Sequence, residues 1–432
     1  MSKNRLKYEN CVIKKAIIFS NESDLDVNLT GAPDVQYAES VFSDTIEVDI
    51  TFGNTVGSVN GKTVMEGLPL VGTEDFELTI QDPNGNDLKV KLNVNKVTPI
   101  RKDTQQEELS LRLTSEEYIR NEELTSRVVK RYDGKISEHI RKILTDNLAT
   151  EKELFIDETS NNYNFIGNVR KPLYIINWLS KKSIPLSDGK KGKTAGFMFY
   201  QTSDGYYFKS IDSLFAQEHV RRYVYANTPD VESNSPQYDG EIVNLIPNNS
   251  LVANQKYSMG AYNTKLIAFN PFNCEYKIIE QDAFEDDDGT THAGKNLPVL
   301  NEKFSATPTR TTYVLKDVGN LPTGSDPREQ LKKNEEENFE VESILNQSIR
   351  RYNQFCTGSL VVDIAPDFDL HAGDCIHIDV PDSGGEIDKQ TSGRYIIGSL
   401  KHRIVEGKRG VTKLGLVRDS FGRKPISGGM LT

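Results

Sequence analysis

Apolar residues recur at every second position through most of the first 114 residues of the chain. Four such runs are Ile46, Val48, Ile50 and Phe52; Phe76, Leu78 and Ile80; Leu88, Val90, Leu92 and Val94; and Leu109, Leu111 and Leu113. A period of two is typical of strands that bury one face and expose the other. Asp82-Pro83-Asn84-Gly85 lies between two runs and suits a tight turn, because Pro sets φ and Asn-Gly accepts positive φ. Residues 1–114 are therefore predicted to form an antiparallel β-barrel or β-sandwich.

A helical period replaces this alternation after residue 114. Thr114-Ser115-Glu116-Glu117 matches a capping box, and Pro172 suits the first turn of a later helix. Aromatic runs on both sides of Ser203-Asp204-Gly205 predict a β-hairpin. Residues 115–212 are therefore predicted to form a small α+β domain. Its central amphipathic helix is expected to start near Asp133 and to bury Ile136, Ile140, Ile143, Leu144 and Leu148.

The rest of the chain predicts a second barrel with an insertion. Segments 219–225 and 257–269 are strand-like, and alternation by twos resumes from residue 360 to 417. We therefore expect 213–269 and 357–420 to form a second, discontinuous barrel, with 270–356 inserted and 421–432 as a tail. The insertion is predicted to be loop-rich from 285 to 327, including an acidic run at 285–288, and then helical from Asp326-Pro327. The buried face of that helix is expected to carry Ile344, Leu345, Ser348, Ile349, Tyr352 and Phe355. The predicted fold class is mainly β with α+β insertions.

Composition and charge narrow the class of protein. Hydrophobic residues make up 36% of the 432 residues and charged residues 27%, which is typical of a folded globular chain. The formal charge is 52 − 63 = −11, which argues against non-specific binding of nucleic acid. The polar start (1–10) and the lack of a long apolar run predict a cytoplasmic product without a membrane anchor. Cys11, Cys274, Cys356 and Cys375 are far apart and are expected to be reduced, buried thiols.

One segment partly matches a phosphate-binding loop. Residues 187–194 end in Gly192-Lys193-Thr194, but Ser187 stands where the motif needs its first Gly. The segment also follows a predicted helix and not a buried strand, so its amides would not converge on a phosphate. We therefore interpret it as a solvated basic turn, and expect Lys191→Ala to be silent.

A second group of residues has the chemistry of zinc ligands. His371, Cys375 and His377 lie within seven residues, with Asp369 and Asp374 beside them. Their spacing matches no four-ligand site, and Leu370 to Asp374 is better explained as a tight turn into a strand. We expect no essential metal and no cofactor.

No other pattern indicates catalysis. His139, His219, His292 and His402 are scattered, and no GxSxG or HExxH motif accompanies them. The acidic run at 286–288 lacks the spacing of a calcium loop. The sequence therefore predicts no catalytic residues, and a scaffold is favoured over an enzyme.

The C-terminal part carries the most specific signal. It contains a Gly373-Asp374 turn, then a strand with Gly393, Tyr395 and His402, and last the strand 411–417. In this order the motifs resemble the closing barrel of the baseplate hub proteins of contractile-tailed phages, a superfamily that includes the late-control D proteins and the hub portion of type VI secretion spikes. Residues 67–78 are similar to the first hub barrel, and 197–215 to the aromatic hairpin of T-even-like hubs. Gly373, Asp374, Gly393, Tyr395 and His402 are the expected structural hub motif.

The resemblance implies an assembly role. It implies two tail-tube-like barrels per chain and a homotrimeric ring that adapts the sixfold tail tube to the threefold central spike. The expected partners are the spike, the tube or tube-initiator proteins, and also the tape measure protein and the baseplate wedge. DNA would pass through the channel without specific binding, and the location would be the virion baseplate after assembly in the host cytoplasm. Residues 394–424 carry nine Lys or Arg against two acids, a net of +7, and are expected to face an acidic partner or a neighbouring subunit.

Two other classes of function stay open at this point. One is an enzyme, either a hub with peptidoglycan-cleaving activity or a carbohydrate-active β-protein. The other is a soluble β-protein that binds a small ligand. Lysis of cell walls by the purified chain would favour the first, and a monomer that binds a small molecule would favour the second.

Overall fold

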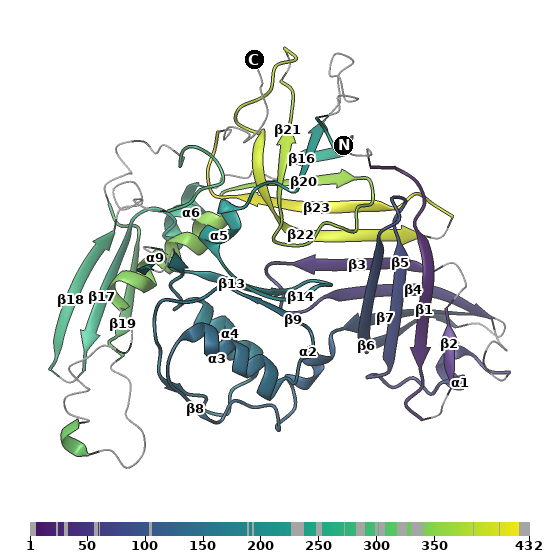
Figure 1. The fold of residues 1–432 in the computed structure, drawn as a ribbon, viewed down its shortest axis with the longest axis horizontal. Helices are drawn as coiled ribbons and strands as arrows, with labels where there is room; N and C mark the ends of the chain where they lie inside the picture. Colours follow the sequence, from purple (N-terminus) through teal and green to yellow (C-terminus); the bar gives the residue numbers. More distant parts are fainter. Residues whose placement is uncertain are drawn as a thin grey trace.

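The computed structural model shows a mainly β protein with small helical parts (Figure 1). The N-terminal strands lie to the right of Figure 1, a barrel lies at the top, an α+β unit lies below and a three-stranded sheet lies at the left. The structure describes residues 6–22, 25–29, 33–55, 59, 61–102, 106–187, 190–191, 194–225, 237–247, 253–271, 273–281, 290–298, 301, 307–317, 326–329, 338, 341–382, 384–405 and 407–422.

One continuous sheet of thirteen strands contains both strand-rich parts of the chain. Its order is β2, β1, β5, β6, β7, β4, β3, β22, β21, β15, β16, β20 and β23. The bounds are β1 (Val12–Phe19), β2 (Asp26–Asn28), β3 (Asp34–Ser40), β4 (Glu47–Thr55), β5 (Asp75–Gln81), β6 (Asp87–Lys102), β7 (Gln106–Thr114), β15 (Arg221–Tyr225), β16 (Gly240–Pro247), β20 (Gly358–Ile364), β21 (Cys375–Asp379), β22 (Gly393–Val405) and β23 (Val411–Arg418), with the short helix α1 (Val64–Gly67) between β4 and β5.

The C-terminal strands form a closed six-stranded barrel. β22 pairs with β21 on one side and with β23 on the other, and β15, β16 and β20 complete the ring. This confirms one of the two predicted barrels. The expected inclusion of the segment up to 269 is wrong, because β17 (Thr264–Asn270) pairs with β18 (Glu275–Gln281) and β19 (Arg310–Leu315) in a separate sheet. Tyr257 is also not in a strand, since it lies in α6 (Ala253–Met259).

The N-terminal strands form a sheet that is joined to the barrel. The predicted alternation is confirmed, since every apolar residue of the four runs is buried, and β5 and β6 form the predicted hairpin around Gly85. Among the described strands, however, β2 and β3 at its two ends do not pair with each other, so no second closed barrel is seen. β3 pairs instead with β22, with Ala38 opposite Lys401.

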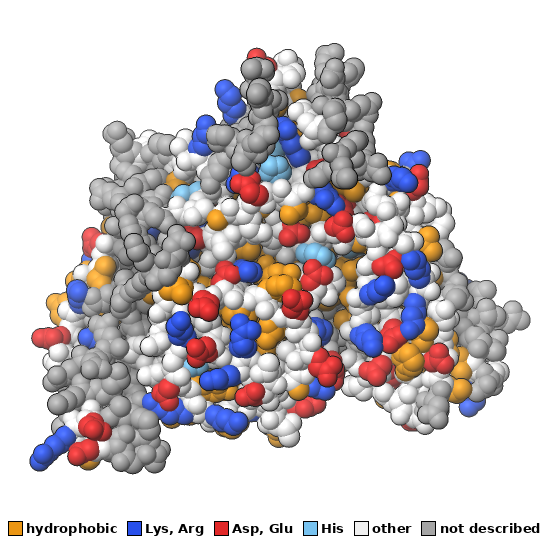
Figure 2. All heavy atoms as spheres, viewed as in Figure 1, with side chains coloured by type: hydrophobic (Ala, Val, Ile, Leu, Met, Phe, Trp, Pro, Cys, Tyr) orange, Lys and Arg blue, Asp and Glu red, His pale blue; other side chains and the backbone are white. Residues whose placement is uncertain are grey.

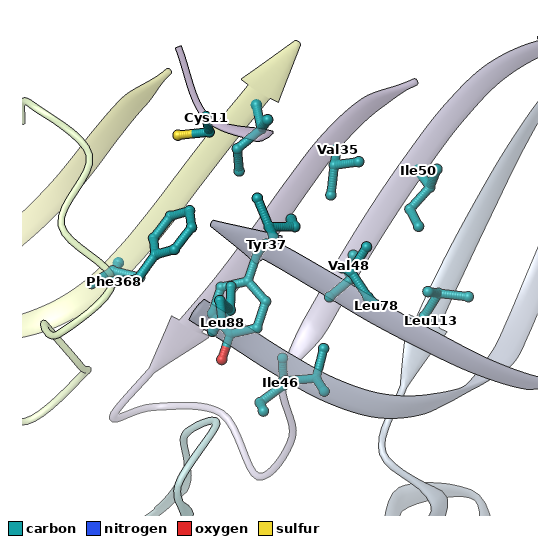
Figure 3. Close-up of a cluster of buried hydrophobic side chains, with 14 of the residues drawn as sticks. Cys11, Val35, Tyr37, Ile46, Val48, Ile50, Leu78, Leu88, Leu113 and Phe368 are labelled. Atoms are coloured by element: carbon teal, nitrogen blue, oxygen red, sulfur yellow. The ribbon is translucent and has the colours of Figure 1, made fainter. Parts of the chain in front are cut away.

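One hydrophobic core runs through this junction. Figure 3 shows side chains of the N-terminal strands, such as Val35, Ile50 and Leu113, in one cluster with Phe368 of the C-terminal part. Tyr37 of β3 is fully buried between them. The two strand-rich parts therefore pack against each other through one shared hydrophobic core.

The α+β unit matches the predicted elements. It contains α2 (Glu116–Arg120), β8 (Arg131–Tyr132), α3 (Ile136–Lys142), the π-helical turn η1 (Ile143–Asn147), β9 (Glu153–Ile156), β10 (Phe165–Ile166), α4 (Pro172–Ser180), β11 (Leu186–Ser187), β12 (Lys190–Lys191), β13 (Phe197–Gln201), β14 (Gly205–Ser210) and α5 (Ile211–Ala216). The hairpin of β13 and β14 is confirmed, and β9 adds a parallel strand that the sequence analysis missed. The five apolar residues predicted for the central helix are all fully buried.

Three local predictions are corrected. Cys11 and Cys375 are buried as expected, but Cys274 and Cys356 are exposed. The capping box is not formed. Ser115 is the N-cap, but its side chain makes no cap hydrogen bond. The Glu117 carboxylate instead accepts a hydrogen bond from the Thr150 hydroxyl and pairs with Lys152. The segment 187–194 includes the short pair β11 and β12, and residues 188–189 and 192–193 lie outside the described residues. The acidic run at 285–288 lies outside them as well.

The long helix buries charge as well as apolar side chains. α9 (Val341–Phe355) corresponds to the later half of the predicted helix, and Ser348 and Phe355 are buried as expected. The prediction of one helix from Asp326-Pro327 onward is wrong, because residues 327–329 are helical but Asn338 lies in a bend before α9 begins. Arg350 and Arg351 on the same helix are also at most 2% exposed. Ile349 and Tyr352 are half-buried, and the side chains of Ile344 and Leu345 lie outside the described residues. A fully buried arginine requires buried partners, and those of Arg351 form part of the site below.

Candidate functional site

The predicted Gly373-Asp374 turn lies where three parts of the chain meet around Glu39 of β3. The Glu39 carboxylate is fully buried and accepts hydrogen bonds from the Tyr37 hydroxyl at 2.5 Å, from Ser203 N at 2.9 Å and from Ala372 N at 2.9 Å. Ser203 belongs to the β13–β14 turn, and Ala372 to the loop before β21. One carboxylate therefore ties together the N-terminal sheet, the α+β unit and the barrel, and we call this site the Glu39 junction.

Gly373 allows the barrel loop to approach the hairpin. Its φ is +95°, and its amide donates to the carbonyl of Ile397 at 2.8 Å. A Cβ added at this position would lie 2.7 Å from Cζ of Tyr200 and closer still to its hydroxyl oxygen. The close approach therefore requires glycine for both conformation and space. Asp374 follows and accepts from His371 N at 2.8 Å, and burial raises the pKa of this carboxyl to about 6.

His371 supplies positive charge to the junction. Its Nδ1 lies 3.3 Å from Glu39 Oε1, and its Nε2 lies 3.4 Å from Asp204 Oδ2. Burial alone would lower the pKa of His371, but the hydrogen bond and charge of Glu39 outweigh it and raise the pKa to about 9. Burial likewise opposes ionisation of Glu39, but the hydrogen bond and charge of His371 are stronger and lower the pKa of Glu39. The pair is therefore ionised in the folded protein at neutral pH.

The other three motif residues all lie on β22. His402 is buried beside the junction, where its Nδ1 lies 2.7 Å from Thr412 Oγ1 and its ring stacks on Tyr37. Burial lowers the pKa of His402 to about 3, so this ring is neutral. Gly393, with φ +137°, begins the strand as predicted. Tyr395 lies near that end, where its hydroxyl donates to Thr391 O at 2.6 Å. The structure thus brings Gly373, Asp374 and His402 together and leaves Gly393 and Tyr395 apart from them.

The group with zinc-ligand chemistry is dispersed. Of its three His and Cys residues only His371 lies at the junction, where Asp374 accompanies it, while Cys375 packs in a separate apolar cluster and His377 Nε2 lies 3.2 Å from Asp379 Oδ1. Within the described part of the chain, no three His, Cys, Asp or Glu side chains are grouped so that they could hold a metal ion. That the protein needs no metal stays a prediction.

A second buried charge network was missed by the sequence analysis. Asp419, directly after β23, accepts from Arg351 Nη1 at 2.9 Å and from Ala293 N at 3.0 Å, and His292 Nδ1 lies 2.7 Å away. Arg351 Nη2 also donates to Asp212 of α5 at 2.9 Å. Burial opposes ionisation of Asp419, but these partners outweigh it and lower its pKa to about 2. One signal existed in the sequence, because Arg351 is three residues after Ser348 and four before Phe355, on the predicted buried face.

The C-terminal basic residues are partly neutralised within the chain. Arg403 pairs with Asp34 at 2.8 Å, Arg394 with Glu218 at 3.2 Å and Lys413 with Asp363 at 3.7 Å. Arg418 is buried against the ring of Tyr395. The expectation that these residues face an acidic partner or a neighbouring subunit is therefore wrong for the buried Arg418, and for Arg394, Arg403 and Lys413 it stays a prediction. On the face seen in Figure 2, Lys and Arg side chains are interspersed with Asp and Glu.

Taken together, these two networks join elements that lie far apart in the sequence. Their charged groups are buried, hydrogen-bonded to one another and to backbone groups, and drawn from segments far apart in the sequence. Buried polar networks of this kind fix one arrangement of the elements, since a shifted arrangement would leave charges unpaired.

The ionised pair of the junction predicts a pH dependence of stability. Because the pKa of His371 is raised from 6.5 to about 9, the folded state keeps a proton that the unfolded state releases in this interval. We therefore expect the free energy of unfolding to fall by about 2–3 kcal/mol as the pH rises from 6.5 to 9. Urea titrations across this range should show a flatter profile for His371→Gln, and equal slopes for the two proteins would contradict the assignment.

Comparison with known proteins identifies the fold. No protein-family model matches the chain, and no curated protein matches its sequence. Among solved structures, a tail protein from Neisseria meningitidis MC58 superposes with a TM-score of 0.53 at 9% identity, over 95% of this chain and 97% of that one. The 43 kDa tail protein of prophage MuSo2 from Shewanella oneidensis gives 0.52 at 9% identity, over 94% and 98%. This chain therefore has the fold of phage tail proteins, which confirms the predicted resemblance at the level of the fold.

None of the helices in the described part is both long and apolar enough to span a bilayer.

Proposed function

We propose that this protein is a structural hub of a contractile phage tail baseplate. In this role three copies form a ring that joins the sixfold tail tube to the threefold central spike. The observation that carries the proposal is the likeness to tail proteins over nearly the whole length of both chains. Because the match includes the barrel, the N-terminal sheet and the parts between them, it concerns the whole architecture and not one common module.

The continuous sheet supports a ring-forming role. Each subunit would offer the six-stranded barrel and the N-terminal sheet side by side, joined through β3 and β22. Three subunits would then present six sheet-built units around one axis, although only one unit per chain is a closed barrel. The edge strand β2 would be covered in such a ring, which would remove an open edge that could aggregate.

Charge supports a channel through which DNA passes without binding. The chain has a net charge of −11, and four of its C-terminal basic side chains are paired or buried within the chain. A surface of mixed charge with an acidic excess repels phosphates weakly and binds them poorly. The spike and the tube proteins are the partners that this role requires, and the tape measure and wedge proteins would lie next to them.

A structure of the assembled tail, or of this protein bound to its spike, tests the proposal. We expect three copies around one channel, with the barrel and the N-terminal sheet of each copy both facing the axis. A ring of another order, or copies placed away from the axis, would exclude the hub role. Clearing of purified cell walls by the isolated chain would instead favour the hub-associated enzyme.

A further inference from the structure

A groove of about 830 Å³ lies between the N-terminal sheet and the α+β unit. One wall is built by β5 and β6, and the opposite wall by α2 and the residues that follow η1. Its most buried polar lining residues are Gln201 and Thr202, at the end of the β13–β14 hairpin. Ligand sites typically have volumes of about 300 to 1,000 Å³, so this space is large enough to hold one. We call it the hairpin groove.

Gln201 brings an unpaired hydrogen-bond donor to the deep end of the hairpin groove. Its Oε1 accepts from Ile46 N at 3.3 Å, which fixes the orientation of the amide, because a backbone N–H can only donate. The side chain is fully buried, and no described residue accepts a hydrogen bond from its Nε2. A buried amide without a partner is destabilising, and few such groups persist in native proteins without a reason. A carbonyl oxygen of a bound molecule would satisfy this donor.

The wall that contains α2 has an irregular backbone. η1 is a π-helical turn, and such turns are frequently found at functional sites. Ala149, which lines the groove just after η1, has φ +49° although it is not glycine. Arg120 holds this conformation, since its Nη1 donates to Leu148 O at 3.3 Å and to Ala149 O at 3.5 Å. Strained backbone that a neighbouring side chain holds in place is concentrated at sites that bind or clamp a ligand.

The charges that line the hairpin groove are balanced. They comprise four Lys or Arg and five Asp or Glu, a net of 4 − 5 = −1. Several of them pair within the walls, as Arg120 does with Glu116 and Lys152 with Glu117. The groove therefore has no surplus of positive charge that would attract a phosphate or a nucleic acid.

Apolar side chains complete the lining. Ile46 lies next to Gln201, and Phe76 and Leu92 form a cross-strand pair of β5 and β6. The ring of Phe76 is only 1% exposed, so its face is not available for stacking on a base. One amide donor beside apolar side chains, without surplus charge, is complementary to a main-chain carbonyl and an apolar side chain of a polypeptide.

We propose that the hairpin groove binds an uncharged, extended segment of a partner protein. A main-chain carbonyl of that segment accepts a hydrogen bond from Gln201 Nε2, and an apolar side chain beside it contacts Ile46 and the pair of Phe76 and Leu92. Main-chain hydrogen bonds combined with pockets for side chains are a recurring means of recognising extended peptides. The site lies within one chain, so this binding goes beyond the hub role and does not depend on the proposed ring.

The occupant is assigned to another protein and not to a second copy of this chain. Uncharged stretches among the described residues, such as β13 and residues 243–247 of β16, are already hydrogen-bonded in sheets of their own fold. A second copy could therefore offer them only by breaking those pairings.

Short neutral peptides test the site directly. The probes are acetyl-leucine methylamide and acetyl-alanyl-leucyl-alanine amide, which present only main-chain amides and apolar side chains. The full chain is labelled with ¹⁵N-glutamine, and the side-chain NH₂ signal of Gln201 is assigned by its loss in Gln201→Met. We expect this signal to shift at about 10 mM peptide, a concentration suited to the weak binding of so small a ligand. Cellotriose and hexathymidylate at the same concentration should leave it in place.

Variants measure the contribution of the unpaired donor. In equilibrium dialysis, Gln201→Met should bind the longer peptide at least about fivefold more weakly, since one hydrogen bond is lost. Gln36→Met, on β3 outside the groove, is the matched control and should bind like the wild type. Because Gln201→Met also removes the acceptor for Ile46 N, Ala149→Asn is a second test that leaves Gln201 intact. Asparagine tolerates positive φ, and its longer side chain narrows the groove, so binding should again weaken.

Several results would overturn the inference. One is a Gln201 signal that neither peptide moves, and another is unchanged peptide binding by both Ala149→Asn and a Gln201→Met variant with the circular dichroism of the wild type. A shift caused by cellotriose or hexathymidylate would replace the peptide with a sugar or a nucleic acid. A wild-type oligomer that Gln201→Met dissociates would make a second copy the occupant. The hub role is tested separately, by the structure of the tail.

Discussion

Gly373→Val is expected to destabilise the protein by at least about 3 kcal/mol, since it combines backbone strain with overpacking at a site that cannot relax. Gly373 has φ +95°, and a Cβ there would overlap the ring and hydroxyl of Tyr200, which is itself buried. Moving Tyr200 would disturb the β13–β14 hairpin, and moving the loop would break the bonds from Ala372 and His371 to Glu39. Urea unfolding of the purified variant measures the loss.

Gly385→Val is the matched control for this substitution. Gly385 also has positive φ, at +83°, but no atom lies within 4 Å of its added Cβ. This variant should therefore lose only the cost of the backbone conformation, about 1–2 kcal/mol. Equal losses at the two positions would show that the contact with Tyr200 contributes nothing.

Asp419→Asn is expected to cost about 3–5 kcal/mol, because it leaves the Arg351 guanidinium buried with half of its compensating charge removed. Arg351 would keep Asp212, whose carboxyl already has a pKa raised by burial. The loss should be largest near neutral pH, where Asp419 is fully ionised. Unfolding monitored by fluorescence and by circular dichroism should give the same reduced stability.

The exposed pair of Arg112 and Asp49 provides the control. Its N···O distance of 2.8 Å is similar to that of the buried pair, but its two side chains are 48% and 34% exposed. Asp49→Asn should therefore change the free energy of unfolding by less than about 1 kcal/mol.

A double variant tests whether the two buried side chains act together. Arg351→Met combined with Asp419→Asn should lose less unfolding free energy than the sum of the losses of the two single variants. Additive losses would mean that the two side chains act independently.

Much of the secondary structure could be predicted from local patterns. The alternation in β4 to β7, the buried face of α3 and η1, and the β13–β14 hairpin depend on residues close in the sequence. Side-chain period and turn chemistry therefore suffice to identify them. The same rules failed where two conformations share a pattern, as at Tyr257, which is helical although its segment looks strand-like.

The candidate site was predicted only in part. Gly373 could be identified because a Gly-Asp turn before a strand is a local signal. Glu39 could not, because one acidic residue in an alternating strand looks like a solvated side chain. Its partners lie 164 residues away at Ser203 and 333 away at Ala372, and no local pattern links them.

The sequence by itself therefore determined most of the strands and helices, the faces that they bury, and the resemblance of the chain to phage tail proteins. Only the tertiary structure decided that β3 pairs with β22, that β17 leaves the barrel for its own sheet, and that Arg351 and Asp419 neutralise each other inside the protein. The physical reason is that a period along the chain specifies which face of an element is apolar but not which element covers it. Strand partners and buried charge partners are selected by contacts between distant residues, and these contacts exist only once the chain has folded.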